Sequence, residues 1–253
     1  METINGEWYM KGCGEEDPLR LRTVEEAAAL IREIGFLPLF SNDIPGFSIE
    51  ERTPPRSWWS EDPTQDPWAW RQILAREPDL IYGKFFDRRA GFVSAQWLPA
   101  FANYRRNGYD FDTLIDEGLA HYRAQKLMGP YLTDGLPNDT ALHSFALKAL
   151  AGFGKGGEKN FEGVLTDLEM QTFLCIGDFR QRLNKRGEPY GWHIAVIETP
   201  EAKLGYEQVT GAYREPPAAS WERIVRQLRR FFPEAPDSQL QTWLGIRRAG
   251  ATK

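Results

Sequence analysis

The apolar residues of the first hundred positions switch between helical and strand-like spacing. Residues 24–34 are apolar at helical intervals between Thr23, a suitable N-cap residue, and Gly35, which predicts the end of this helix. The apolar run over 36–40 predicts a short buried strand or an apolar turn, and a second helix is predicted over 67–76. The stretch before this second helix is rich in proline, which predicts irregular structure.

A β-hairpin followed by two amphipathic helices is predicted next. The short β-type runs 80–86 and 90–94 flank three polar residues, as the strands of a hairpin flank its turn. Residues 96–106 and 110–127 then carry aromatic and aliphatic side chains at helical spacing. We therefore expect strands and helices to share one structural unit.

The segment 109–200 has the element order of a winged helix-turn-helix. Shorter helices are predicted over 141–150 and 161–170, after the long helix that opens the segment. Two strands follow over 172–176 and 192–198, and a basic, turn-rich loop joins them. Three helices followed by a hairpin is the order of this motif.

The remaining residues predict helices over 200–209 and 220–232 and a short last helix that ends near residue 243. Together the elements predict an α+β fold of tandem winged helix-turn-helix units, mostly helical, with short β-hairpin wings. The C-terminal helices resemble the start of a further winged unit. The expected units are 1–108, 109–200 and 201–253.

The charges of this chain are unevenly distributed. The net charge of the 253 residues is −5, but residues 1–66 hold 14 acidic and 6 basic side chains, against 22 and 25 in the rest. An acidic N-terminal region argues against an N-terminal arm that wraps nucleic acid. The segments 84–106 and 179–192 are locally basic, with five bases against one acid and four bases against one acid.

The sequence favours a cytoplasmic protein that contacts no membrane. Its apolar runs are too short to span a bilayer, and the first ten residues lack the apolar core of a secretory signal. Cys13 and Cys175 are far apart in the sequence, and only three histidines are present. We therefore expect no metal site and no cofactor, and a monomer in solution.

Four segments carry short apolar and turn motifs that resemble one known family in the same order. That family is the AlkZ/YcaQ group of winged-helix proteins, known for bacterial DNA glycosylases that release alkylated or crosslinked bases. The chain is most similar to the small AlkZ-related members. The resemblance implies DNA binding and a link to DNA repair. The matching segments are 34–40, 81–106, 120–201 and 226–245.

The motifs that carry catalysis in this family are replaced in this chain. The glycosylases have a Gln-x-Gln or Gln-x-Asp motif that holds a water against the glycosidic carbon, and its positions here are Pro38 and Phe40. Their His-apolar-Pro element, which helps to grip the lesion, matches Gly91 and Ser94. The resemblance therefore implies the fold and DNA binding, but not base excision by the mechanism of the family.

Three carboxylates just downstream of the replaced motif could substitute for it. Asp43, Glu50 and Glu51 are candidates for the group that positions a water, as an excision reaction requires. The alternative is that they are solvated loop acids or helix caps. An active glycosylase with a substitute carboxylate thus remains a second hypothesis.

The expected partner is DNA, including damaged duplex, bound mainly through its phosphates. The helix over 161–170 occupies the recognition position but carries three acids and no base, which argues against sequence-specific binding in the major groove. The alternative is that the basic turns only confer solubility. The candidate DNA-binding residues are Lys84, Arg88, Arg89, Arg105, Arg106, Arg180, Arg182, Lys185 and Arg186.

A candidate pocket is formed by Trp58 and Trp59, from a tryptophan-rich stretch that also holds Trp68 and Trp70, together with Tyr82 on the first predicted hairpin. Aromatic faces stack on bases of any sequence, so this cluster could serve as a stacking platform. The alternative is a small core that fixes the proline-rich loop. A third hypothesis follows, in which the chain has kept only the fold and binds a small molecule or a protein in this cleft.

Overall fold

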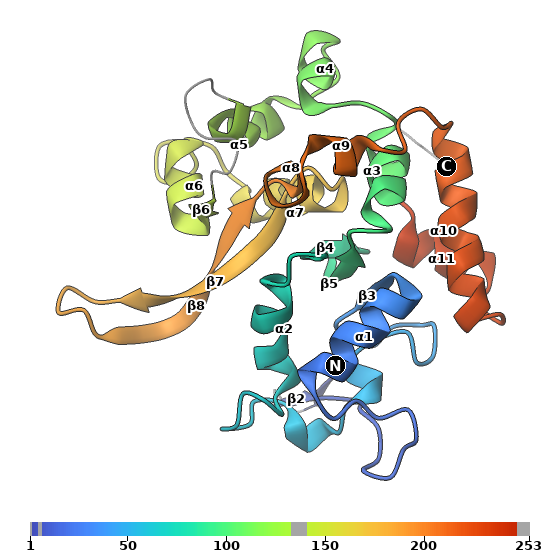
Figure 1. Cartoon of the computed structure of the whole chain (residues 1–253). Coiled ribbons are helices and arrows are strands. Elements are labelled where there is room, and N and C mark those ends of the chain that lie inside the picture. Colours follow the sequence, from blue (N-terminus) through green and yellow to red (C-terminus); the bar gives the residue numbers. More distant parts are fainter. Residues whose placement is uncertain (1, 5–6, 133–140, 247–253) are drawn as a thin grey trace.

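The computed structural model describes residues 2–4, 7–132 and 141–246, which form an α+β fold (Figure 1). Its centre is an antiparallel six-stranded sheet with the order β3-β5-β4-β7-β8-β6. A separate N-terminal hairpin consists of β1 (Glu2–Ile4) and β2 (Glu7–Tyr9). The strands of the large sheet are β3 (Phe36–Pro38), β4 (Leu80–Phe86), β5 (Arg89–Ser94), β6 (Leu142–His143), β7 (Cys175–Leu183) and β8 (Pro189–Glu198).

Helices pack around this sheet along the whole chain. The N-terminal half contributes α1 (Val24–Ile34), η1 (Glu50–Arg52), η2 (Pro55–Ser57), α2 (Pro67–Ala75), α3 (Leu98–Arg106) and α4 (Phe111–Asp116). The C-terminal half contributes α5 (Tyr122–Leu132), α6 (Ser144–Leu150), α7 (Phe161–Met170), α8 (Pro200–Leu204), α9 (Tyr206–Thr210), α10 (Pro217–Phe231) and α11 (Asp237–Leu244).

The first helix has the ends that the sequence predicts. The hydroxyl of Thr23 accepts the backbone N–H of Glu26 at 3.2 Å, and Gly35 takes the left-handed conformation at φ +97°. The carboxylate of Glu26 accepts the N–H of Arg22 at 2.6 Å instead of that of the cap residue. The prediction of a helix over 24–34 is confirmed.

The first hairpin is also confirmed. β4 and β5 pair with Ile81 opposite Val93, and the turn residues Asp87 and Arg88 have φ values of 44° and 66°. Two consecutive left-handed residues form the turn that matches the natural twist of paired strands. The hairpin is therefore tight, and it fixes the position of the basic residues at its tip.

The two hairpins that the sequence places in separate units form one sheet. Tyr82 on β4 pairs with Ile176 on β7, so the second hairpin continues the sheet of the first. The buried apolar residues likewise form one continuous cluster that extends from α1 to α11. The division into units 1–108, 109–200 and 201–253 remains a prediction.

The second hairpin, named the arm here, consists of residues 175–198 and projects from the body of the molecule (Figure 1). Its strands are longer than the predicted 172–176 and 192–198, and most of the expected loop between them is strand. The turn occupies only residues 184–188. Most side chains of the outer arm are exposed on both faces, so the apolar alternation that marks a strand is missing there.

Two of the predicted helices are each interrupted by a glycine. The expected helix over 110–127 is wrong, because the chain turns at Gly118, with φ +69°, and continues as two helices. The expected helix over 200–209 is divided at Gly205, with φ +87°. At these angles only glycine is free of steric strain. The apolar spacing continues across both breaks and conceals them in the sequence.

Candidate nucleic-acid interface

The tip of the arm presents two basic side chains to solvent. Lys185 and Arg186 are exposed, and within the described part of the chain neither side chain forms an ion pair. The turn beneath them is held by two hydrogen bonds, because the side-chain oxygen of Asn184 accepts the N–H groups of Arg186 at 2.8 Å and of Glu188 at 3.1 Å. The charges therefore stand at a fixed end of the hairpin.

Arg182 lies between two aromatic rings along the arm. Its guanidinium is 5.0 Å from the ring centre of Phe145 on α6 and 4.6 Å from that of Tyr190 on β8. Contacts of this kind combine cation–π attraction with packing of the side-chain stem. Arg182 thus connects the arm to α6 while its charge stays near the surface.

The root of the arm is fastened to α2 by a shared carboxylate. Asp178 accepts from Arg76 at 2.5 Å and from Arg180 at 3.3 Å, and Arg76 also donates to the carbonyl of Phe179 at 3.1 Å. Partial burial acts to raise the pKa of Asp178, but the hydrogen bonds from Arg76 and the N–H of Phe179 outweigh it and lower the pKa. Asp178 therefore holds both arginines in place.

The basic residues of the first hairpin face α7. The ammonium of Lys84 donates to the hydroxyl of Thr166 at 3.1 Å, and the backbone N–H of Lys84 donates to Glu169 at 3.3 Å. Arg88 forms an ion pair with Asp167. Two of the three acids on α7 are therefore partners of the first hairpin, which explains why a helix in this position is acidic.

Arg89 is exposed beside these residues. Its guanidinium lies 5.0 Å from the ring centre of Trp243 and donates to the carbonyl of Ser41 at 3.4 Å. Its charge is not paired with an acid in these contacts, so it remains a candidate for binding a phosphate. It lies on the hairpin rather than on the arm.

Arg105 is buried, which contradicts its expected contact with DNA. The guanidinium donates to the carbonyls of Met170 at 2.9 Å, Phe85 at 2.6 Å and Leu244 at 3.1 Å. Loss of solvent around this charge lowers the pKa of Arg105 to about 9. This residue connects three segments of the core and is inaccessible to a phosphate.

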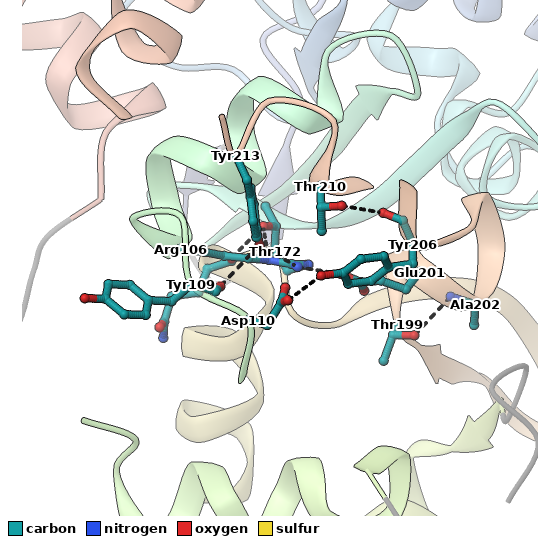
Figure 2. Close-up of polar contacts among 11 residues, drawn as sticks. Arg106, Tyr109, Asp110, Thr172, Thr199, Glu201, Ala202, Tyr206, Thr210 and Tyr213 are labelled. Atoms are coloured by element: carbon teal, nitrogen blue, oxygen red, sulfur yellow. Dashed lines mark hydrogen bonds and ion pairs between the residues drawn. The ribbon is translucent and has the colours of Figure 1, made fainter. Parts of the chain in front are cut away.

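Arg106 is buried as well, within the network shown in Figure 2. It pairs with Glu201 on α8, donates to the carbonyl of Thr172 at 2.6 Å, and contacts the hydroxyl of Tyr213 at 3.2 Å. Its expected contact with DNA is therefore wrong too. A neighbouring pair, the Tyr206 hydroxyl donating to Asp110 at 2.6 Å, borders the same junction (Figure 2).

Two of the three candidate carboxylates stabilise their own loop. The oxygens of Glu50 accept the N–H groups of Lys11 and Ser41, both at 2.9 Å, and the side chain is fully buried. Glu51 accepts the hydroxyl of Ser48 at 2.6 Å and the N–H of Gly46 at 3.1 Å. These contacts fix the loop in place.

The third candidate, Asp43, is exposed on the same loop. Pro38 on β3, and Phe40 just after that strand, lie close by in the sequence. The ring of Phe40 stacks on Trp58 with ring centres 6.0 Å apart. Pro38 and Phe40 thus contribute apolar side chains to this region.

Two of the three residues expected to line a pocket are buried. Trp58 is buried and donates to the Thr53 hydroxyl at 3.0 Å. Tyr82 is buried too, and this burial raises its pKa to about 12. Trp59 is 43% exposed and lies beside Trp68 with ring centres 6.4 Å apart. Of the three pocket candidates, only Trp59 is accessible to a ligand.

The structure adds aromatic residues of the arm that the sequence does not single out. Trp192 and Tyr190 on β8 and Phe145 on α6 are all exposed. Their signal in the sequence is the pair of aromatic residues around Gly191, directly after the basic turn. The sequence predicts a loop and a core strand for this segment, so it does not predict that these side chains form a surface.

Among residues 2–4, 7–132 and 141–246, no cluster of three or more His, Cys, Asp or Glu side chains is arranged to hold a metal ion. Across the same residues, none of the helices combines the length and apolarity needed to cross a bilayer. Cys13 and Cys175 are both free thiols.

The comparison with known proteins gave one match. A sequence model of a protein family described as AlkZ related matches residues 21–245, which is most of the chain. The curated proteins contain no significant match to the chain, and neither do the solved structures. The matched segment includes the first hairpin (β4 and β5), α7 and the whole arm.

Proposed function

The chain belongs to the AlkZ-related family, which is related to DNA-repair glycosylase-like proteins, and we propose that it binds DNA through the arm. The observation that carries the proposal is a hairpin that projects from the body of the molecule (Figure 1). Its sequence places basic side chains at the tip and along its length. Such a hairpin can follow a phosphate backbone without reading base sequence.

The arm is a better phosphate-binding element than the first hairpin. Lys185 and Arg186 are exposed at its tip, whereas Lys84 and Arg88 contact Thr166 and Asp167 on α7. A phosphate at the first hairpin would have to compete with these contacts. At the tip of the arm it would replace only water.

We further propose that residues 109–200 act as a winged helix-turn-helix unit with the arm as its wing. The acidic helix α7 would then be a structural helix rather than a reading element. Asp167 is paired with Arg88, and Glu169 is fully buried against β4. Neither carboxylate is free to accept a hydrogen bond from a base edge, and contact with DNA would be independent of sequence.

Binding rather than base excision is the function that the candidate site supports. Pro38 and Phe40 provide no polar side chain to hold a water, and Glu50 and Glu51 hold backbone and hydroxyl groups of their own loop. General acid–base catalysis requires a group within hydrogen-bond reach of the reacting water. We therefore propose a non-excising DNA-binding protein.

The test is fluorescence anisotropy with a short labelled duplex at low and moderate salt. The triple variant Arg180→Ala, Lys185→Ala, Arg186→Ala is expected to bind at least about tenfold more weakly, with a salt slope reduced by roughly 0.9 for each phosphate that the protein no longer neutralises. Arg180 is included because it shares the single carboxylate of Asp178 with Arg76, which leaves the two arginines with a net positive charge. Arg182 is kept, because it packs on Phe145 and Tyr190.

The matched control removes three exposed charges outside the arm, in the variant Arg22→Ala, Arg214→Ala, Arg226→Ala. Both variants lower the net charge by three, so a general charge effect would weaken both equally. Equal binding by the two variants, or no binding by the wild-type protein at low salt, would contradict the proposal.

A further inference from the structure

Trp192 is an unusually exposed tryptophan. Its exposed fraction is 75%, the largest of any exposed large hydrophobic side chain in the described part of the chain. A tryptophan loses much favourable burial free energy when it is left in water. The exposure of this side chain on the basic arm therefore indicates a role in binding a ligand.

The backbone at Trp192 leaves regular strand geometry. Arg182 pairs with Tyr190 and Arg180 with Ile194, so Gln181 alone lies opposite residues 191–193. Gly191 has φ +64°, which suits a residue without a side chain. This is a bulge, a feature that redirects a side chain out of the regular alternation of a strand.

The bulge is held in one conformation by a side chain of the facing strand. The amide nitrogen of Gln181 donates to the carbonyls of Tyr190 at 3.1 Å and Gly191 at 3.0 Å. These bonds hold the last paired residue before the bulge, Tyr190, and the first residue of the bulge, Gly191. Trp192 is thus presented from a fixed backbone, and binding would not have to order a flexible loop first.

The surroundings of Trp192 favour a nucleobase over an apolar protein surface. Arg180, Lys185 and Arg186 lie on the same hairpin, whereas Glu188 is the one acid between residues 179 and 192. Charged residues are depleted in the centre of protein–protein interfaces. Aromatic rings within a basic groove are instead typical of surfaces that bind unpaired nucleotides by stacking and phosphate contacts.

We propose that Trp192 stacks on an unpaired base and directs the arm to DNA whose base stack is interrupted. In an intact duplex each base face is covered by its neighbours, so an indole ring can stack only where a base is missing, bulged or displaced. This inference rests on the proposed function, because the basic residues of the arm must first bring the phosphate backbone to the ring.

The experiment compares two labelled duplexes that differ in one two-nucleotide bulge. The wild-type protein is expected to bind the bulged duplex about tenfold more tightly, within the range that one stacked base contributes. Trp192→Ala is expected to abolish this preference and to change affinity for the intact duplex less than about twofold. Trp192→Phe keeps a smaller ring and is expected to retain part of the preference.

Leu150→Ala is the matched control, because it removes a large exposed apolar side chain at the end of α6. It is expected to leave the preference unchanged. If Trp192→Ala keeps the full preference while the triple variant of the arm still loses binding, the stacking role is wrong and the proposed function stands. If the wild-type protein binds neither duplex at low salt, both are wrong.

Discussion

Arg106 and Glu201 form an ion pair in which the arginine side chain is 1% exposed and the glutamate side chain 25%. The pair joins α3 to α8, and the same guanidinium contacts Thr172 and Tyr213 (Figure 2). The arginine therefore depends on this one carboxylate for neutralisation of a charge that water does not reach.

Glu201→Gln is expected to lower the free energy of unfolding by about 2–4 kcal/mol. The substitution leaves the buried guanidinium without its charge partner, which costs more than the loss of an exposed pair. Urea unfolding measures the difference. Glu207→Gln, in an exposed residue of α9, is the control, and an equal effect of both substitutions would refute the structural role of the pair.

Glu169 is expected to make stability depend on pH. Burial raises its pKa from 4.5 to about 7, against the lowering effect of Lys84, and in the described residues one of its oxygens has no hydrogen-bond partner. A raised pKa means that the folded state favours the neutral acid. This contribution to stability is present below pH 4.5 and is lost as the pH rises to about 7.

Glu169→Gln is therefore expected to match the wild-type protein near pH 5 and to be more stable at pH 8, by on the order of 2 kcal/mol. Urea unfolding of both proteins between pH 5 and pH 8 isolates this group, because other titrating groups cancel in the difference. Asp167→Asn, in an exposed acid of the same helix, serves as the control. A constant difference across the pH range would contradict the assignment.

Arg88 and Asp167 are expected to affect DNA binding in opposite directions. Arg88→Gln should change the dissociation constant less than about twofold, because its guanidinium is already paired with Asp167. Asp167→Asn frees this arginine and removes a negative charge, so it should tighten binding about two- to threefold. Anisotropy at low salt measures both. A loss on Arg88→Gln as large as that of the triple variant would place the first hairpin at the centre of the interface.

No base excision is expected from duplex DNA that carries an N7-alkylated base. Under the proposed function, Pro38 and Phe40 offer no polar side chain to hold a water, and the ring of Phe40 stacks on Trp58. The assay uses protein in excess over DNA and resolves cleaved from intact strands after treatment of abasic sites. Release of the base would refute the proposal of a non-excising protein. Loss of that release in Asp43→Asn would identify the exposed carboxylate as the substitute.

The local elements of the fold could be predicted where one periodicity and its end signals agree. Thr23 and Gly35 bound a helix with a clear apolar face, and the polar turn at Asp87 and Arg88 separates two buried strands. The prediction of a helix over 110–127 failed because the apolar spacing persists across Gly118. Apolar periodicity indicates which residues are buried on each side of a helix break, but it does not detect the break itself.

The candidate site could be predicted only in part. The sequence does not distinguish a basic side chain that is exposed to water from one that is buried and donates to backbone carbonyls. Lys185 and Arg186 are exposed as expected, whereas Arg105 and Arg106 are buried by segments more than 60 residues away. The exposure of Trp192 also depends on a bulge opposite Gln181, which no local pattern indicates.

Because Tyr82 pairs with Ile176, the arm is anchored to the body at its root and extends freely from there. Its fixed end is a strand of the central sheet, and Arg76 braces the root at Asp178. The arm strands continue directly from the sheet, without a linker that could act as a hinge. A force on the tip would therefore be transmitted to the core through backbone hydrogen bonds. The arm would therefore approach a ligand at a fixed angle and a fixed distance from the body. The shape of a bent or kinked ligand would have to adjust to the protein, because the arm would not adjust to the ligand.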